Sequence, residues 1–273
     1  MSEFRDKAVL ITGAGRGIGK RLALGFAAVG ARVGLMARSK PELDLTQLEI
    51  EHQGGVAIRL RADVRDPEAL RTGIDRMRAQ FGPIHVLICA AGIQGPVGPF
   101  LANAGGGFAE TVETNLNGVM VTCAAVLPEM VDRRSGKAVI LSGGGGAVAR
   151  PGFAAYAASK AGLIRFVETL AEEIREHNVQ INCMSPGGAY THMTDQILAA
   201  GDKVSWKEQE DARQVRLTGG VPAEKQVALA MFLASERSNH VSGKLLHVKD
   251  DWKRLENSPV TPDMFTLRRV QKG

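Results

Sequence analysis

The sequence has few cysteines, few aromatic residues and no long apolar run. Its three cysteines, Cys89, Cys123 and Cys183, lie far apart in apolar stretches. This spacing argues against a disulfide framework and predicts buried free thiols in a reducing compartment, which we take to be the cytoplasm. No apolar run reaches the roughly 18 residues that span a bilayer, and the charged amino terminus lacks the core of a signal peptide. We therefore expect a soluble protein with no membrane partner.

Tracts of one charge and paired metal ligands are also missing. The formal net charge is +5 over 273 residues, and basic residues such as Arg133 and Arg134 occur in pairs. Aromatic residues make up 5% of the chain, so we expect no stacking platform and no nucleic-acid partner. The six histidines show no paired ligand spacing and no C-x-x-C occurs, which predicts no metal site. The missing G-x-S-x-G elbow argues against a serine hydrolase.

What the chain does have is a regular alternation of strand and helix patterns. It is 44% hydrophobic and 23% charged, as in a protein with a sizeable core. Helical stretches of crossover length separate the apolar strands, which predicts a mainly parallel sheet with helices on both faces. No linker divides residues 1–250, so we expect a single domain. The expected strands are residues 7–11, 32–36, 56–62, 85–91, 137–141, 179–184 and 244–248, and the expected helices include residues 20–29, 41–53, 108–130, 153–177 and 222–233.

A glycine-rich loop follows the first expected strand directly. Residues 12–19 read Thr-Gly-Ala-Gly-Arg-Gly-Ile-Gly, and an apolar helix begins at once. Strand, glycine loop and helix together present backbone amides and a helix amino terminus to a phosphate. A flexible glycine turn is the alternative, which the position between strand and helix disfavours. The candidate dinucleotide-binding residues here are Gly13, Gly15, Arg16, Gly17, Ile18 and Gly19.

The end of the second expected strand bears on the choice of dinucleotide. An acidic residue there binds the adenosine 2′-hydroxyl, whereas an arginine accommodates a 2′-phosphate. Ala37 and Arg38 fill this place, with Arg16 as support, so the sequence favours NADP(H) over NAD(H). An ordinary surface arginine is the alternative. Asp63 follows the third strand. It either accepts a hydrogen bond from the adenine amino group or caps the helix that begins after Pro67.

Tyr156 and Lys160 lie four residues apart in the expected helix 153–177. Positions with this spacing share one helix face, so the phenol and the ammonium influence each other. A nearby cation lowers the pKa of a tyrosine, which makes the pair a candidate proton donor or acceptor for a substrate oxygen. The alternative is an ordinary exposed helical pair.

Taken together, the motifs resemble the short-chain dehydrogenase/reductase family, in its compact single-domain branch, over nearly the whole chain. The resemblance implies a Rossmann-like, doubly wound α/β fold with about seven strands, a nicotinamide cofactor and a homo-oligomer, either tetramer or dimer. The residues that carry it are Thr12 to Gly19, Asp63, Ala91, Gly92, Asn115, Tyr156, Lys160, Pro186, Gly187 and Thr191.

The resemblance also implies roles for single residues. Tyr156 would be the acid/base, and Lys160 would bind the nicotinamide ribose and lower the pKa of Tyr156. Asn115 would hold a water that links Lys160 to solvent; its alternative is a polar residue that kinks a helix. Thr191 and Gly187 would contact the nicotinamide end. Further cofactor contacts implied are Val64, Ala91, Gly92 and Pro186.

Two positions depart from the family pattern. Gly143 stands where the family has its catalytic serine, and Ser142 is one residue away. Either a bulge turns Ser142 inward as a catalytic residue, or the serine role is missing or filled by a backbone amide. Cys89 and Ala90 stand where the family commonly has two asparagines.

Two further segments complete the picture. Residues 191–220 are polar and partly helical, and the resemblance implies a substrate lid. Residues 251–273 form a carboxyl-terminal extension, which either reaches a neighbouring subunit's site or covers a surface. The expected function is an NADP(H)-dependent oxidoreductase that interconverts a carbonyl and an alcohol on a small molecule. The alternatives are a lyase or epimerase of the same fold with retained nicotinamide, or a non-catalytic dinucleotide-binding protein.

Overall fold

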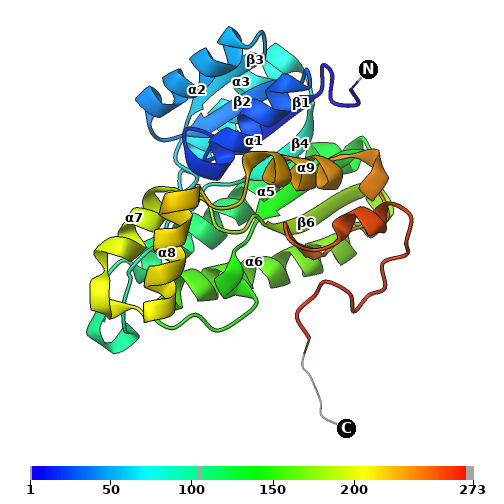
Figure 1. The fold of residues 1–273 in the computed structure, drawn as a ribbon. Coiled ribbons are helices and arrows are strands. Elements are labelled where there is room, and N and C mark those ends of the chain that lie inside the picture. Colours follow the sequence, from blue (N-terminus) through cyan, green and yellow to red (C-terminus); the bar gives the residue numbers. More distant parts are fainter. Residues whose placement is uncertain (1, 104–105, 269–273) are drawn as a thin grey trace.

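A single parallel sheet of seven strands organises the molecule, with the strand order β3-β2-β1-β4-β5-β6-β7 (Figure 1). The computed structural model describes residues 2–103 and 106–268. The expected α/β fold is confirmed, and every strand lies within two residues of its predicted bounds. The order reverses between β1 and β4, and in such sheets ligands bind beyond the carboxyl ends of the strands at that point. The strands are β1 (Ala8–Thr12), β2 (Arg32–Ala37), β3 (Val56–Arg61), β4 (Ile84–Cys89), β5 (Gly136–Leu141), β6 (Val179–Ser185) and β7 (Leu245–His247).

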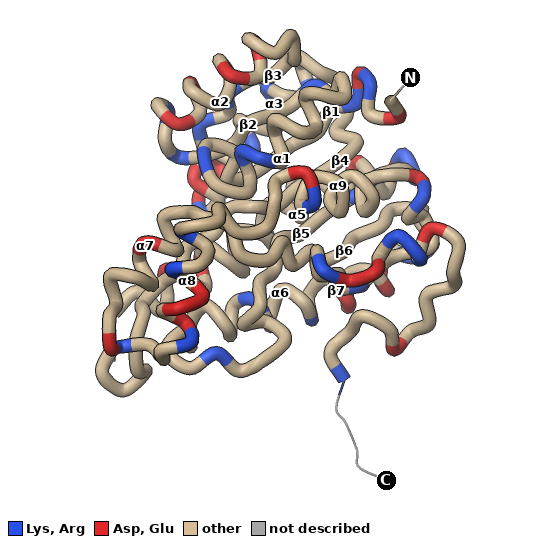
Figure 2. The backbone as a smooth tube through the Cα atoms, in the orientation of Figure 1, with Lys and Arg blue, Asp and Glu red and all other residues tan. Residues whose placement is uncertain are grey.

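Helices cover both faces of this sheet. Side chains alternate along β1, so that Val9 and Ile11 join the core under α1, α2 and α9, while Ala8 and Leu10 join the core under α3, α5 and α6. Strands β1, β4 and β6 carry no Lys, Arg, Asp or Glu, and Figure 2 shows these charges on the surrounding helices and loops. None of the described helices has the length and apolar character needed to cross a bilayer. The helices are α1 (Gly17–Ala28), α2 (Lys40–His52), α3 (Pro67–Phe81), α4 (Phe108–Val112), α5 (Gly118–Asp132), α6 (Ala154–Glu173), α7 (His192–Ala199), α8 (Trp206–Thr218) and α9 (Ala223–Ala234).

The expected helix 108–130 is present but is interrupted. A π-helical turn, η2 (Glu113–Asn117), joins α4 to α5, and Asn115 lies in its middle. Such turns insert one extra residue into a helix and are frequent at functional sites. The apolar spacing of the sequence does not distinguish this turn from continuous α-helix.

Helices α7 and α8 stand to one side of the sheet and form the segment expected to be a lid (Figure 1). The segment leaves and rejoins the main domain at an antiparallel bridge between Ala189 and Gly220. Backbone hydrogen bonds from Tyr190 N to Gly219 O and from Val221 N to Gly188 O, 3.2 and 2.7 Å long, close its base. We refer to residues 189–220 as the lid. A small apolar cluster beneath it contains Phe153, Ile197, Val204 and Ala212, with Tyr156 packed against them.

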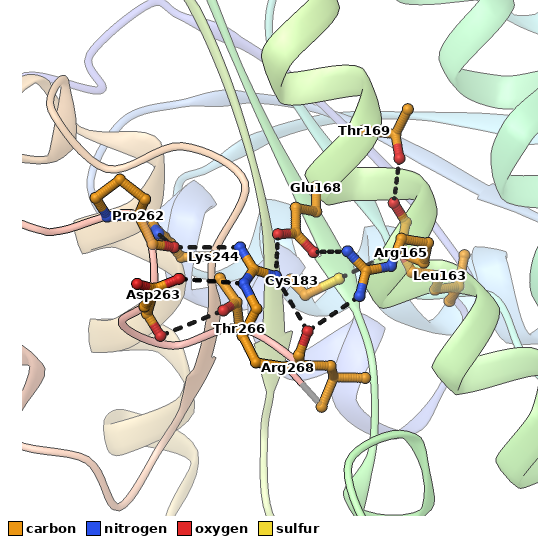
Figure 3. A network of polar contacts seen from close by, with 11 residues as sticks. Leu163, Arg165, Glu168, Thr169, Cys183, Lys244, Pro262, Asp263, Thr266 and Arg268 are labelled. Carbon is orange, nitrogen blue, oxygen red and sulfur yellow. Dashed lines mark hydrogen bonds and ion pairs between the residues drawn. The ribbon is translucent and has the colours of Figure 1, made fainter. Parts of the chain in front are cut away.

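The carboxyl-terminal extension lies on its own chain as far as it is described. Leu245 N of β7 donates to Phe265 O at 2.8 Å, and Trp252 stacks on Phe232 of α9 with ring centroids 5.1 Å apart. Lys244 Nζ donates to two tail carbonyls, those of Thr261 and Pro262. Figure 3 shows Pro262, Asp263 and Arg268 of the tail within this polar network. Residues 251–268 of the extension therefore pack on this chain's own surface, and a contact with a neighbouring subunit's site stays a prediction. Residues 269–273 lie outside the described part.

Candidate active site

The glycine loop after β1 lies directly against the end of β4. A side-chain carbon on Gly13 would stand 2.7 Å from the backbone of Ala91, and Gly13 has φ +68°. Both facts restrict this position to glycine. Thr12 Oγ1 accepts a hydrogen bond from Ala91 N at 3.3 Å, which fixes the two segments together. The loop and the end of β4 thus form one floor of bare backbone.

The amino terminus of α1 opens onto this floor. Arg16 precedes the helix in an extended conformation, and no side chain caps the helix amides. Uncapped amides at a helix start form a site for an anionic group. Thr191 faces this loop, since its methyl lies 3.2 Å from the place of a side-chain carbon on Gly17. A reciprocal capping box with Thr194 holds Thr191 at the start of α7. The glycine loop and Thr191, which are far apart in the sequence, therefore lie side by side.

The Pro186–Gly187 turn is held by polar contacts from the α1 and α9 side. Gln226 Nε2 donates to Pro186 O at 3.0 Å, and Arg21 donates to Gln226 Oε1 and Val221 O at 3.1 and 3.2 Å. A cavity of about 900 Å³ lies behind this turn, lined by residues 220–225 and 247–253 among others. It contains neither Tyr156 nor Lys160, so we do not assign the candidate chemistry to it.

At the end expected to hold the adenosine, Arg38 and Asp63 face each other. Arg38 Nη1 lies 3.8 Å from Asp63 Oδ2. The side chains of Arg38 and Arg16 are each more than half exposed. Arg65 binds Asp63 more closely, at 2.7 Å, and its hydrogen bonds hold the pKa of that carboxyl below its usual value. The cap of α3 is Asp66, which accepts from Glu68 N and Ala69 N. The alternative that Asp63 caps this helix is therefore wrong.

Three other predicted cofactor residues pack against neighbouring parts of the chain. Val64 is buried against the start of α5, where a side-chain carbon on Gly118 would lie 2.6 Å from its methyl. Ile18 is partly buried against the core under α1. On the opposite side of the loop, Gly15 packs against Glu42, where a side-chain carbon would lie 2.9 Å from Glu42 Cβ.

Tyr156 and Lys160 lie on one side of α6, near its first turn. The Lys160 ammonium is 5.6 Å from the centre of the Tyr156 ring and donates to Leu141 O at 2.8 Å. A side-chain carbon on Gly92 would lie 3.7 Å from Lys160 Nζ and 3.2 Å from Asn115 Oδ1. The bare backbone that begins at the glycine loop thus continues along the end of β4 to Lys160, which neighbours Tyr156.

Burial controls the ionisation of this pair in the free protein. It lowers the pKa of the Lys160 ammonium to about 8 and raises the pKa of the Tyr156 phenol. The cation that lowers the pKa of Tyr156 in the free chain is Arg150. The expectation that Lys160 also depresses this pKa stays a prediction. Arg150 was missed, and its place in the loop shortly before Tyr156 was the available signal.

Asn115 is fully buried, and its side chain is fully engaged. Its Oδ1 accepts from Ile93 N at 2.8 Å, and its Nδ2 donates to Ile93 O and Ser159 Oγ at 2.9 and 3.1 Å. The amide therefore pins the segment after β4 to α6. Both donors of the amide are engaged, so a water held by Asn115 would donate to an oxygen of this residue, and that role stays a prediction.

Gly143, not Ser142, lies against the Tyr156 hydroxyl. A side-chain carbon on Gly143 would stand 2.6 Å from the Tyr156 oxygen. Ser142 N continues the β5–β6 ladder by donating to Met184 O, and neighbouring side chains of extended chain point to opposite sides. Ser142 Oγ is buried without a hydrogen-bond partner among the described residues. The hypothesis that Ser142 turns inward beside Tyr156 is not supported, which leaves a serine role that is either missing or filled by a backbone amide.

Comparison with known proteins relates this site to an enzyme family. The family model described as short chain dehydrogenase matches residues 7–201. Gluconate 5-dehydrogenase of Gluconobacter oxydans is 34% identical over 243 residues, which cover 88% of this chain and 91% of that protein. The 3-oxoacyl-[acyl-carrier-protein] reductase of Staphylococcus aureus is 31% identical over 243 residues, covering 89% of this chain and 96% of the relative. The structure of NAD⁺-bound xylitol dehydrogenase superposes with a TM-score of 0.82 at 26% identity, covering 90% and 98% of the two chains.

Proposed function

The chain belongs to the short-chain dehydrogenase/reductase family of oxidoreductases, which use a nicotinamide cofactor, and from this premise we propose that it interconverts a carbonyl and an alcohol with NADP(H). The observation that carries the proposal is the unbroken contact from Gly13 through Ala91 and Gly92 to Lys160, with Tyr156 beside it. A dinucleotide laid along bare backbone would reach from the glycine loop to the acid/base pair.

The residues of this chain fit such a cofactor. The uncapped amides of α1 suit its phosphates, and the space that glycines leave at positions 13 and 17 allows close approach. Lys160 and Thr191 would hold the nicotinamide half. When bound, the nicotinamide supplies the hydride chemistry of the reaction. Everything else falls to the protein: orienting the substrate, excluding water and moving one proton.

The proton belongs to Tyr156. In the reductive direction its hydroxyl gives a proton to the substrate oxygen, and in the oxidative direction it takes one. Lys160 places a positive charge on the same side, and its hydrogen bond to Leu141 O fixes the direction of the ammonium. With glycine at position 143, the backbone next to Tyr156 takes the place of a serine hydroxyl in shaping the site. The polar lid favours a polar small molecule as substrate.

The preference for NADP(H) rests on Arg38. No acidic residue follows β2 directly, and the exposed guanidinium of Arg38 is free to meet a 2′-phosphate. Asp63 lies 3.8 Å from it but is engaged by Arg65. The NAD⁺ in xylitol dehydrogenase belongs to that protein, and cofactor choice within one fold varies with the residues that meet the adenosine ribose.

A panel of ketones, aldehydes and alcohols with NADPH and NADH, read at the nicotinamide absorbance band, tests the proposal. Tyr156→Phe should lower kcat by roughly 10²- to 10⁴-fold while NADPH binding persists, because only the proton donor is removed. Tyr190→Phe, the one other tyrosine of the chain, is the matched control and should stay within about twofold.

A second function is favoured by one observation. The glycine at position 143 suits a non-catalytic dinucleotide-binding protein, because such a protein needs no carbonyl polarisation. Tight NADPH binding without turnover of any compound in the panel would show that the chain is a non-catalytic dinucleotide-binding protein and not an oxidoreductase. Full turnover in Tyr156→Phe would remove the assigned acid/base and with it the proposed mechanism.

A further inference from the structure

The lid is joined to the start of α6 by a two-point ion pair. Arg150, in the loop before α6, donates from Nε and Nη2 to the two carboxylate oxygens of Glu208 on α8, at 2.8 and 2.7 Å. Both side chains are 22% exposed. Ser205 Oγ caps α8 and accepts from Glu208 N at 3.3 Å, which holds this acidic residue in the first turn. Two-point pairs of this kind fix orientation as well as distance.

The same guanidinium lies over the aromatic residues that begin α6. Its central carbon is 3.8 Å from the centre of the Phe153 ring and 5.9 Å from the centre of the Tyr156 ring. Phe153 is fully buried in the apolar cluster beneath the lid. Arg150 therefore contacts the lid with its donors and the acid/base helix with its face.

Arg150 is also the charge that acts on the Tyr156 hydroxyl. Lys160 Nζ lies 5.6 Å from the centre of the Tyr156 ring and is bonded to Leu141 O, and Asp195 of α7 is bonded to Tyr190. Among the groups around Tyr156, Arg150 is the one that lowers its pKa against the effect of burial. The charged and titratable groups on the elements packed around Tyr156 include Lys160 of α6, Arg150 of the preceding loop, Glu208 of α8, His192 and Asp195 of α7 and Lys203 between α7 and α8. Further along α8, Arg213 and Glu210 pair with each other.

We propose that Arg150 is a positioning residue that fastens the lid to the acid/base helix and sets the charge that the Tyr156 hydroxyl faces, with Glu208 as its counter-charge. The inference rests on the proposed role of Tyr156 as acid/base. Closing the lid and preparing the proton donor are then one event, because the same side chain takes part in both. Departure of Glu208 with the lid would free the guanidinium and change the field at the phenol.

The two partners should therefore have opposite effects on Tyr156. Removing Arg150 removes the cation, so the phenol should hold its proton more tightly. Removing the charge of Glu208 leaves the guanidinium uncompensated, so the phenol should release its proton more easily. A purely structural ion pair would give effects of the same sign, since either change loosens the same contact.

The chain has two tyrosines, so a Tyr190→Phe background makes tyrosinate absorbance a direct report on Tyr156. We expect this absorbance, at a fixed alkaline pH where circular dichroism is native, to fall in Arg150→Met and to rise in Glu208→Gln. The lid pair Arg213–Glu210, which is on the same helix as Glu208, provides matched controls in Arg213→Met and Glu210→Gln, with no change expected. Changes of one sign in the Arg150 and Glu208 variants, or none, would overturn the proposal.

Amide hydrogen exchange tests the fastening role and needs no substrate. Exchange across the lid should speed up at least severalfold in Arg150→Met and Glu208→Gln relative to the control variants. Arg150→Lys keeps the charge without the two-point contact, so it should keep the tyrosinate absorbance while the lid exchanges faster. Unchanged lid exchange in all three variants would overturn the fastening role. Because both readouts are independent of turnover, failure of the proposed oxidoreductase activity is recognised separately.

Discussion

At the scale of single residues, position 143 decides how the phenol is seated. Gly143→Ser would place a carbon 2.6 Å from the Tyr156 oxygen, which forces the hydroxyl out of its place. Displacements of about 1 Å in an active site cost roughly 10²-fold, so kcat/KM should fall by about that factor. Gly144→Ser is the control, because a side-chain carbon there meets nothing within 4 Å. Equal or higher activity in Gly143→Ser would show that Tyr156 is not held against this backbone.

The buried ammonium of Lys160 should make stability depend on pH. Its pKa is about 8 in the folded chain and 10.5 when exposed, so the unfolded state binds more protons between these values. The free energy of unfolding should therefore rise with pH across this window, by on the order of 3 kcal/mol at most for one such group. Below pH 8 the cost of burying the charge is present in full.

Lys160→Met should flatten this rise and abolish activity, measured by urea unfolding at pH 7.5 and 9.5 and by turnover. Lys137, whose pKa burial also lowers to about 8, is the matched comparison. Lys137→Met should flatten the rise by a similar amount while activity persists, since Lys137 bonds Asn239 away from the site. A pH dependence equal to that of the unmodified chain in Lys160→Met would contradict the assignment.

The spacing of residues in the sequence predicted the local part of the site but not the contacts between distant segments. Tyr156 and Lys160 were predicted together because their relation is local to one helix. The contact of Arg150 with Glu208 joins positions 58 residues apart, and no spacing rule connects them. The loss of a hydroxyl at Gly143 was visible in the sequence, but the seating of Tyr156 against that backbone depends on how β5 ends.

At the scale of elements, the extension beyond β7 should contribute to stability through Glu168 of α6. Its carboxylate pairs with Arg165 and with Arg268 of the tail and is 15% exposed (Figure 3). Glu168→Gln should lower the free energy of unfolding by about 1 kcal/mol and expose the tail to proteolysis. Glu172→Gln, in an exposed pair one turn on, should have almost no effect. Equal protection of the tail in both variants would contradict the contact.

Elements were predicted where their pattern is local. Apolar runs and glycine or proline punctuation identified the seven strands, but the π-helical turn at Asn115 escaped because its apolar spacing matches that of the helices around it. What stabilises that turn is a two-way hydrogen bond with Ile93, from another part of the chain. The hydrogen bond from Leu245 to Phe265 is likewise non-local, which left the course of the tail open.

At the scale of the whole molecule, a cofactor that bridges β1, β4 and α6 should stabilise the entire sheet. At about 100-fold over its dissociation constant, NADPH should add roughly 2.7 kcal/mol to the free energy of unfolding. The melting temperature should rise more with NADPH than with equal NADH. Arg38→Asp should reverse this order, because the carboxylate repels a 2′-phosphate and accepts from a 2′-hydroxyl. If NADPH raised the melting temperature more than NADH in both the unmodified chain and Arg38→Asp, Arg38 would not determine the cofactor preference.

The parallel sheet followed from the alternation of patterns, because crossover connections leave few other topologies, and its strand reversal was implied by the family resemblance. How the lid sits relative to that sheet did not follow, since it depends on the cluster around Phe153 and on the Arg150 contact.

The narrow base of the lid has an evolutionary consequence. Both of its ends meet at the bridge between Ala189 and Gly220, so the chain between them returns to the point it left. Such an excursion is a cassette: it can be lengthened, shortened or exchanged with that of a relative without shifting the register of β6 or β7. Substrate preference can then diversify at one locus, provided that the exchanged segment keeps Thr191 and an acidic partner for Arg150 in the place of Glu208.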